Sequence, residues 1–248
     1  MIFVRTDDTD ANRQPPSPNL SFYRIFIAHL WLYGTPTIVG YGNNGLRFGY
    51  SLVTPQFVTC SGEAFTLEGL QAVGDETSDN VSVSTIDAFG ALVSTYTWND
   101  WAADAACWVD DSYTPVEGVA VPVGQAFWVG GSAEAQSLQS AGQVGMKDVS
   151  VALRFGYTLL GNPFPVAVAL QDIVAEGEAC SDNVSISTID SFGGLVATYT
   201  WNDWAADNAC WVDDSYTPVE GVSIAPGQGL WAGASAATQA IRFPAPEL

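Results

Sequence analysis

Residues 78–121 read SDNVSVSTIDAFGALVSTYTWNDWAADAACWVDDSYTPVEGVAV, and residues 181–224 read SDNVSISTIDSFGGLVATYTWNDWAADNACWVDDSYTPVEGVSI. About 37 of these roughly 44 positions are identical at a constant offset of 103, so the stretch is present twice. The two copies must therefore form the same structural unit, and this constraint comes before every other signal in the chain. A length of 248 residues has room for two such units of about 100 residues each.

Most of the repeat has the chemistry of β-strands. VSVSTI at 81–86 alternates valine with serine, which is typical of a half-buried strand. DAFG at 87–90 supplies a turn, and ALVSTYTW at 91–98 is expected to return as the second strand of a hairpin. ACWVD at 106–110 and QAFWVGG at 125–131 are short apolar runs, which we predict to be further strands.

Helical signals are confined to one turn in each copy. LEGLQAVG at 67–74 and LQDIVAEG at 170–177 have apolar residues three and four positions apart. Closely spaced strands without long amphipathic helices predict an all-β fold. We expect two tandem antiparallel β-sandwich-like modules related by internal duplication, over residues 47–145 and 146–248. VSVAL at 149–153 is expected to close the first module or to join it to the second.

Residues 1–46 differ from the repeats. A polar, proline-containing stretch is followed by an apolar run that Arg24 and His29 interrupt. This run is shorter than the roughly 20 unbroken apolar residues that a membrane span needs, and it lacks the plan of a signal peptide. We expect an irregular N-terminal segment that contributes a strand or two to the first module. The sequence leaves open whether Met1 is the natural start or the chain is a piece of a longer exported protein.

The first copy carries about four more residues than the second between its opening segment and the long repeat. Length differences between related units fall in surface loops, so residues 58–66 are predicted to form one.

The charge balance limits the partners. The chain has 27 acidic and 7 basic residues, a formal net charge of -20. Such a field repels phosphate backbones, so we expect no nucleic-acid partner. A composition of 48% hydrophobic and 12% aromatic residues indicates a globular protein. An acidic, lysine-poor surface is common on secreted proteins, so an extracellular or cell-surface location is predicted.

Two segments of the second copy resemble the ends of a known repeat module. GYTLLGNPFP at 156–165 begins the unit, and PGQGLWA at 226–232 ends it. The first copy keeps the second segment, at 123–129, but has VTPQF at 53–57 in place of the glycine-asparagine-proline turn. In these motifs the chain resembles the tandem β-sandwich modules of large secreted or surface-anchored bacterial proteins. The resemblance implies a fold and an exported setting, and it brings no catalytic residues.

The densest group of candidate functional residues lies in YTWNDWAAD at 96–104 and CWVDDSY at 107–113, with twins at 199–207 and 210–216. Exposed tryptophan rings flanked by carboxylates and amides are what a sugar-binding face needs. The alternative is that the tryptophans belong to the core, which we favour for Trp98, Trp108 and Trp128. The candidate ligand-binding residues are Asn99, Asp100, Trp101, Asn202, Asp203 and Trp204.

Acidic side chains in the same loops offer oxygen ligands for calcium. Their spacing matches no EF-hand loop, and acidic loops are usually only solvated. The candidate metal ligands are Asp104, Asp110, Asp111, Asp207, Asp213 and Asp214. We expect no cofactor, with calcium as the alternative.

Four cysteines allow three pairings if all are bonded. Cys107 and Cys210 occupy the same repeat position, whereas Cys60 and Cys180 do not correspond. A Cys180–Cys210 disulfide with a Cys60–Cys107 analogue is one alternative, and unpaired buried thiols are the other. The chain has no Cys-x-x-Cys pair and a single histidine, His29, which argues against zinc.

Enzyme chemistry is poorly supported. A serine-histidine-aspartate triad cannot be built inside the repeats, and no glycine-rich phosphate loop is present. Paired carboxylates for glycoside hydrolysis would require two identical active sites in small modules. We therefore expect a non-catalytic structural or adhesive repeat of an exported bacterial surface protein, because tandem copies multiply weak contacts. The alternative is a carbohydrate-binding module that uses the repeated Trp/Asp loop. Glycans or other surface proteins are the expected partners.

Overall fold

The computed structural model describes residues 39–57, 65–133 and 135–247. Within these residues the chain consists of strands, turns and two single turns of 3-10 helix, so the predicted all-β fold is confirmed. Every pair of neighbouring strands is antiparallel. Across the described ranges, no helix has the length and apolar character needed to cross a membrane.

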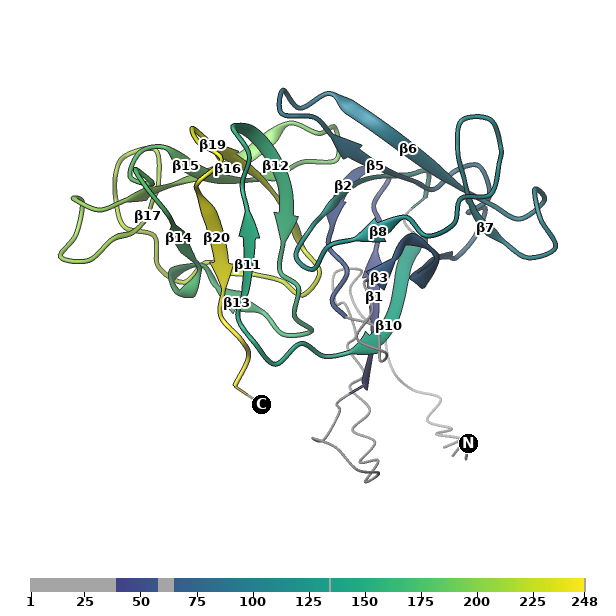
Figure 1. Ribbon diagram of the computed structural model, residues 1–248, viewed down its shortest axis with the longest axis horizontal. Coiled ribbons are helices and arrows are strands. Elements are labelled where there is room, and N and C mark those ends of the chain that lie inside the picture. Colours follow the sequence, from purple (N-terminus) through teal and green to yellow (C-terminus); the bar gives the residue numbers. More distant parts are fainter. Residues whose placement is uncertain (1–38, 58–64, 134, 248) are drawn as a thin grey trace, which may run out of the picture.

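Each half of the chain forms the same three sheets (Figure 1). The five-stranded sheets have the orders β2-β9-β5-β6-β7 and β12-β19-β15-β16-β17; the three-stranded sheets are β1-β10-β4 and β11-β20-β14; the two-stranded sheets are β3-β8 and β13-β18. The strands of the first half are β1 Val39–Gly45, β2 Gly49–Val53, β3 Phe65–Thr66, β4 Leu70–Val73, β5 Ser82–Ile86, β6 Leu92–Asn99, β7 Cys107–Val109, β8 Ala120–Val121, β9 Phe127–Gly131 and β10 Ser137–Gln143. Those of the second half are β11 Val149–Ala152, β12 Gly156–Gly161, β13 Val168–Ala169, β14 Val174–Glu176, β15 Val184–Ile189, β16 Leu195–Asn202, β17 Cys210–Val212, β18 Ser223–Ile224, β19 Gly229–Ala234 and β20 Ala240–Phe243.

The predicted hairpin is β5 and β6, joined by the turn at residues 87–91. The single helical turn predicted in each copy is confirmed, in the form of a 3-10 turn. The 3-10 helices cover Leu67–Gly69 and Leu170–Asp172, and the residues that follow them enter strands β4 and β14. One turn is enough to bury Leu67, and the sheet then continues because β10 and β20 offer it partners.

The strand expected from the N-terminal segment is present, and the alternatives for VSVAL at 149–153 are decided. β1 pairs with β10 over its whole length. The end of the N-terminal segment 1–46 therefore supplies a strand that completes a sheet of the first half, as expected. β11, which covers most of VSVAL, pairs with β20 and therefore belongs to the second half. Of the loop predicted at 58–66, residues 58–64 lie outside the described residues. The last two residues, Phe65–Thr66, form β3.

Each half has its own apolar core around a pair of tryptophans. Trp98 and Trp108 are 9% and 1% exposed, and their rings meet edge to face with centroids 5.2 Å apart. The indole nitrogen of Trp108 donates a hydrogen bond of 2.9 Å to the carbonyl of Leu70, which satisfies its one polar atom in the core. Trp201 and Trp211 repeat this geometry. The core interpretation is therefore confirmed for Trp98 and Trp108.

A third apolar core lies between the halves. It contains the buried residues Leu52, Ile86, Ala126, Leu159 and Ile189, with Trp128 and Trp231 packed against it. Successive side chains of a strand point to opposite faces, so β2 and β5 send Val53 and Val83 into the first core while Leu52 and Ile86 face the other half. Trp128 is half-buried at this boundary, in edge-to-face contact with Trp231, so it packs against the core between the halves and not the one that holds Trp98 and Trp108.

Reciprocal hydrogen bonds close the boundary. Arg47 of the first half donates a hydrogen bond of 2.8 Å to the carbonyl of Ile189, and Arg154 of the second half donates one of 2.6 Å to the carbonyl of Ile86. β12 lies against β5 and β9, and β19 lies against β2. Each half thus contributes the same residues to the interface, as in an isologous dimer.

The shared interface changes the predicted architecture. The small sheets are arranged like a four-bladed propeller ring, and the chain does not divide clearly into two sandwiches. The reason is that the five-stranded sheets are apolar on both faces near β2, β5 and β9, so each sheet packs on its own core and on the opposite half. A sandwich of two independent modules would leave Leu52 and Ile86 in water.

Glycine is required where the halves meet. Gly49 has φ +94°, and a Cβ placed on it would lie 2.1 Å from the carbonyl oxygen of Ser191. The next residue, Tyr50, donates its backbone N–H to that same oxygen at 2.9 Å. Gly156, Tyr157 and Ala88 repeat these contacts in the opposite direction.

We expect Gly49→Ala to lower the free energy of unfolding by more than about 2 kcal/mol, because it combines a left-handed backbone with a backbone collision. Urea-induced unfolding of the full chain measures this. Gly45→Ala is the matched control, since a Cβ at Gly45 meets no atom within 4 Å. Equal unfolding midpoints for the two variants would contradict the described interface.

Candidate functional site

An exposed pair of aromatic rings occurs once in each half. Trp101 is 60% exposed, and its ring lies 5.1 Å from that of Tyr113 with the planes tilted by 34°. Trp204 is 61% exposed and stacks on Tyr216 at 5.2 Å and 32°. The ring exposure that the sugar hypothesis requires is therefore present in both copies, while its role in binding stays a prediction. We call residues 78–79, 99–104 and 110–114 the first head, and their twins 181–182, 202–207 and 213–217 the second head.

Asn99 supports the first head from inside and is not available to a ligand. It is fully buried, its Oδ1 accepts the backbone N–H groups of Trp101 and Ala102 at 3.0 and 2.7 Å, and its Nδ2 donates to Asp79 at 2.8 Å. Asn202 makes the same bonds in the second head. The prediction that these asparagines contact a ligand is therefore replaced by a positioning role, because their amide groups hold the loop that presents the tryptophan.

Asp79 holds the indole ring of Trp101 in place. Its Oδ2 accepts the indole N–H at 3.0 Å, while its Oδ1 accepts the Nδ2 of Asn99. Asp79 has φ +61°, a left-handed conformation that costs a non-glycine residue roughly 1–2 kcal/mol. Strain of this kind persists only where the surrounding structure enforces it. Asp182 repeats the strain and the bonds to Trp204 and Asn202.

Tyr113 also has a left-handed backbone, with φ +58°. The turn that carries it begins at Asp110, whose Oδ1 accepts the amides of Ser112 and Thr114 at 2.9 and 3.0 Å. The hairpin turn at Asp87 has the same hydrogen bonds, but the residue equivalent to Tyr113 is Gly90. The same turn thus takes glycine where no ring is needed and tyrosine where the ring covers Trp101.

The acidic residues proposed as metal ligands do not converge. Among the described residues, no group of three or more His, Cys, Asp or Glu side chains is placed to hold a metal ion. Asp110 and Asp213 use one carboxylate oxygen in their own turns, and Asp100 accepts a hydrogen bond of 2.8 Å from Ser78. The backbone N–H of Asp203 donates to Ser181 at 3.1 Å. The remaining candidates, Asp104, Asp111, Asp207 and Asp214, are exposed on the heads.

The described cysteines are unpaired. Cys107 and Cys210 are half-buried on β7 and β17, and Cys180 is 7% exposed in the second core. A Cys180–Cys210 disulfide is therefore absent, because Cys180 fills an apolar position instead. Cys60 and the single histidine, His29, lie outside the described residues. Burial, and next the negative charge of Glu176, raise the pKa of the Cys180 thiol.

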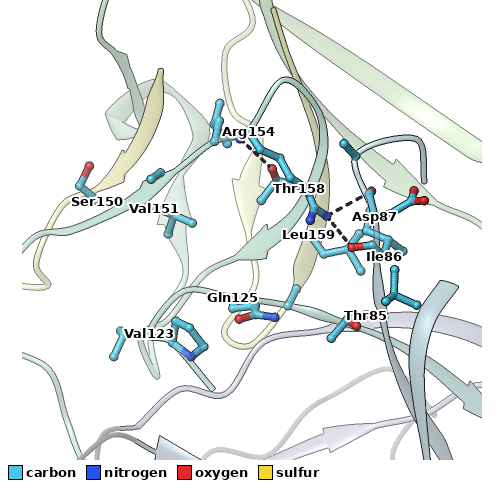
Figure 2. Close-up of a pocket in the computed structure, with 16 residues that line it drawn as sticks. Thr85, Ile86, Asp87, Val123, Gln125, Ser150, Val151, Arg154, Thr158 and Leu159 are labelled. Carbon is cyan, nitrogen blue, oxygen red and sulfur yellow. Dashed lines mark hydrogen bonds between the residues drawn. The ribbon is translucent and has the colours of Figure 1, made fainter. Parts of the chain in front are cut away.

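A cleft of about 730 Å³ lies at the boundary between the halves (Figure 2). It carries two charged side chains, and both are engaged in the wall. Arg154 donates to the carbonyls of Ile86 and Asp87, and the Oδ1 of Asp87 accepts the amides of its own turn. The cleft therefore follows from the interface. Ser150 also lines it, and its hydroxyl donates to the carboxylate of Glu176 at 3.3 Å.

The two heads lie far apart. They flank β7 and β17, which are at opposite ends of the long axis of the molecule (Figure 1). No protein-family model, curated protein or solved structure matches the chain. The geometry of the heads is thus the main observation that bears on function.

Sequence reasoning selected Trp101 but missed its two supports, Asp79 and Tyr113. Asp79 lies 22 residues away in the chain, so only the fold brings it to the indole. For Tyr113 a signal was available, since DDSYT at 110–114 and DAFGA at 87–91 both begin with a turn-forming aspartate. Comparing them would have shown a tyrosine at a position that favours glycine.

We expect Tyr113→Ala to destabilise the protein more than Tyr113→Gly, by about 1 kcal/mol. Both variants lose the ring, but only glycine also relieves the left-handed backbone. Thermal unfolding of the two full-length variants measures the difference. Equal melting temperatures would show that the turn does not impose a left-handed residue at this position.

We expect Cys180 in the native protein to react with a thiol reagent at pH 8 far more slowly than Cys107 and Cys210. The thiolate is the reactive form, and both burial and the raised pKa of Cys180 reduce it. Peptide mass mapping after timed labelling measures the rates, with urea-unfolded protein as the control in which all thiols react. A Cys180–Cys210 disulfide in the peptide map would refute the assignment.

Proposed function

We propose that the chain is a non-catalytic adhesive protein built from two copies of one module, exported to the bacterial cell surface, with the two heads as its contact sites. The observation that carries the proposal is that an exposed, braced tryptophan-tyrosine pair occurs twice, at opposite ends of the molecule. Exposed aromatic rings are the side chains that dominate the energy of protein contacts. Exposing these rings to water, with the tyrosine of each pair in a left-handed backbone conformation, lowers the stability of the fold. A cost of this kind favours a role in binding.

The arrangement of the heads supports bridging of two surfaces. A third core and reciprocal hydrogen bonds join the halves, so the heads are held in a fixed relative orientation. Two equal sites on one body convert a weak contact into a strong one when both engage the same surface, and they link two surfaces when they face apart.

Carbohydrate binding is the second candidate function. It is favoured by the open indole faces of Trp101 and Trp204, on which the C–H face of a sugar ring can pack. Asp100 and Asp203 lie next to these rings in the chain and are exposed. The buried asparagines reduce the set of polar partners that such a site would offer to sugar hydroxyls.

Adhesion of protein-coated beads tests the proposed function. The surfaces are neutral polysaccharides (cellulose, chitin and galactan) and polylysine. We expect binding to at least one surface, loss of that binding in the Trp101→Leu/Trp204→Leu double variant, and partial binding in either single variant, which keeps one intact head.

Gly45→Ala serves as the control with intact heads. The proposed function would be overturned if the beads adhered to none of the surfaces, or if the double variant adhered as well as the parent chain.

A further inference from the structure

The charges around the heads are of one sign. Residues 48–146 and 155–241 contain no Lys, Arg or His at all. The basic side chains of the described residues serve elsewhere: Arg47 and Arg154 bond across the interface, Arg242 pairs with Asp148 and Glu176, and Lys147 lies in the linker between β10 and β11. Among the described residues, each head therefore presents an aromatic surface surrounded by acidic side chains alone.

The carboxylates that border the indole offer a ligand negative charge, but few of their oxygens are free to accept a hydrogen bond from it. Both oxygens of Asp79 accept bonds from within the head, and one oxygen of Asp100 accepts from Ser78. The amide of Asn99 is buried and engaged. A neutral sugar packed on Trp101 would find these partners occupied, whereas a cation needs only the charge.

The electrostatics of the Trp101 indole also favour a cation over its face. Its N–H donates to a carboxylate, and this bond polarises the ring so that its face becomes more negative. Tryptophan is the aromatic side chain that attracts cations most strongly across its face. Tyr113 lies against the indole, and the exposed fraction of 60% leaves area for a ligand.

We propose that each head binds a positively charged segment of a partner protein, with a lysine or arginine side chain over the indole of Trp101 or Trp204. This inference rests on the proposed function, since it names the ligand class of the same heads. Charge complementarity selects the partner: several carboxylates surround one ring, so a segment with more than one basic residue gains from each of them. An uncharged or acidic partner gains nothing from this field.

Titration of the full chain with hexalysine, followed by tryptophan fluorescence and calorimetry, tests the proposal. We expect two equivalent sites per chain, weaker binding as salt is raised, and no binding of hexa-acetyllysine, which has the same length without the charge. The Trp101→Leu/Trp204→Leu variant should lose affinity by about 3- to 30-fold, with Phe at both positions giving an intermediate loss. Circular dichroism confirms that the variants are folded.

Charge variants separate a head-specific site from general attraction to an acidic protein. Asp104→Asn with Asp207→Asn should weaken binding, whereas Glu247→Gln, near the C-terminal end, should change it little. Hexalysine binding that is indifferent to Trp101→Leu/Trp204→Leu would mean unspecific ion pairing and would overturn the proposal.

Neutral oligosaccharides of glucose and of N-acetylglucosamine form the second arm. Binding of these sugars that depends on Trp101 and Trp204, without hexalysine binding, would overturn the cationic ligand and keep the heads as contact sites. Absence of binding in both arms, together with beads that adhere to no surface, would remove the proposed function as well.

Discussion

The close approach of the two halves at Gly49 and Gly156 is the constraint on which the rest of the structure depends. It lets Tyr50 and Tyr157 donate to carbonyls of the opposite half, and it brings Arg47 and Arg154 within reach of the strand ends. These bonds cover a core of aliphatic side chains that neither half encloses alone. Because the contacts of Gly49, Tyr50 and Arg47 recur at Gly156, Tyr157 and Arg154, the interface fixes one orientation of the halves and hence the opposed positions of the heads.

The exposed aromatic ring of each head is held in place by side chains beside and below it. Buried Asn99 organises the loop, Asp79 fixes the indole, and Tyr113 supports the ring from a turn that favours glycine. Preorganisation lowers the entropy that a ligand must remove on binding, so a small exposed platform can still be a useful contact site. The energetic cost of the left-handed residues is offset by the packing of the module that carries them.

The charged residues also differ between the interface and the heads. Arginine appears where a carbonyl of the opposite half must be reached, and acidic side chains occupy the loops at the ends. Within the described ranges the heads are therefore acidic and aromatic, whereas Arg47 and Arg154 lie at the interface between the halves. Such a pattern is the basis on which we propose a basic partner for the heads.

The sequence by itself determined the all-β fold, the duplication, the hairpin at 81–98 and the exposed Trp101, because turn residues and period-two alternation act locally. It did not show that Leu52, Ile86 and Trp128 pack against the other half, since an apolar residue looks the same whichever core it enters. Likewise Asn99, predicted to face a ligand, and Cys180, a candidate for a disulfide, are buried. Only the tertiary structure decided these positions, because it alone brings Asp79 to Trp101 and one half onto the other, across separations that no local pattern encodes.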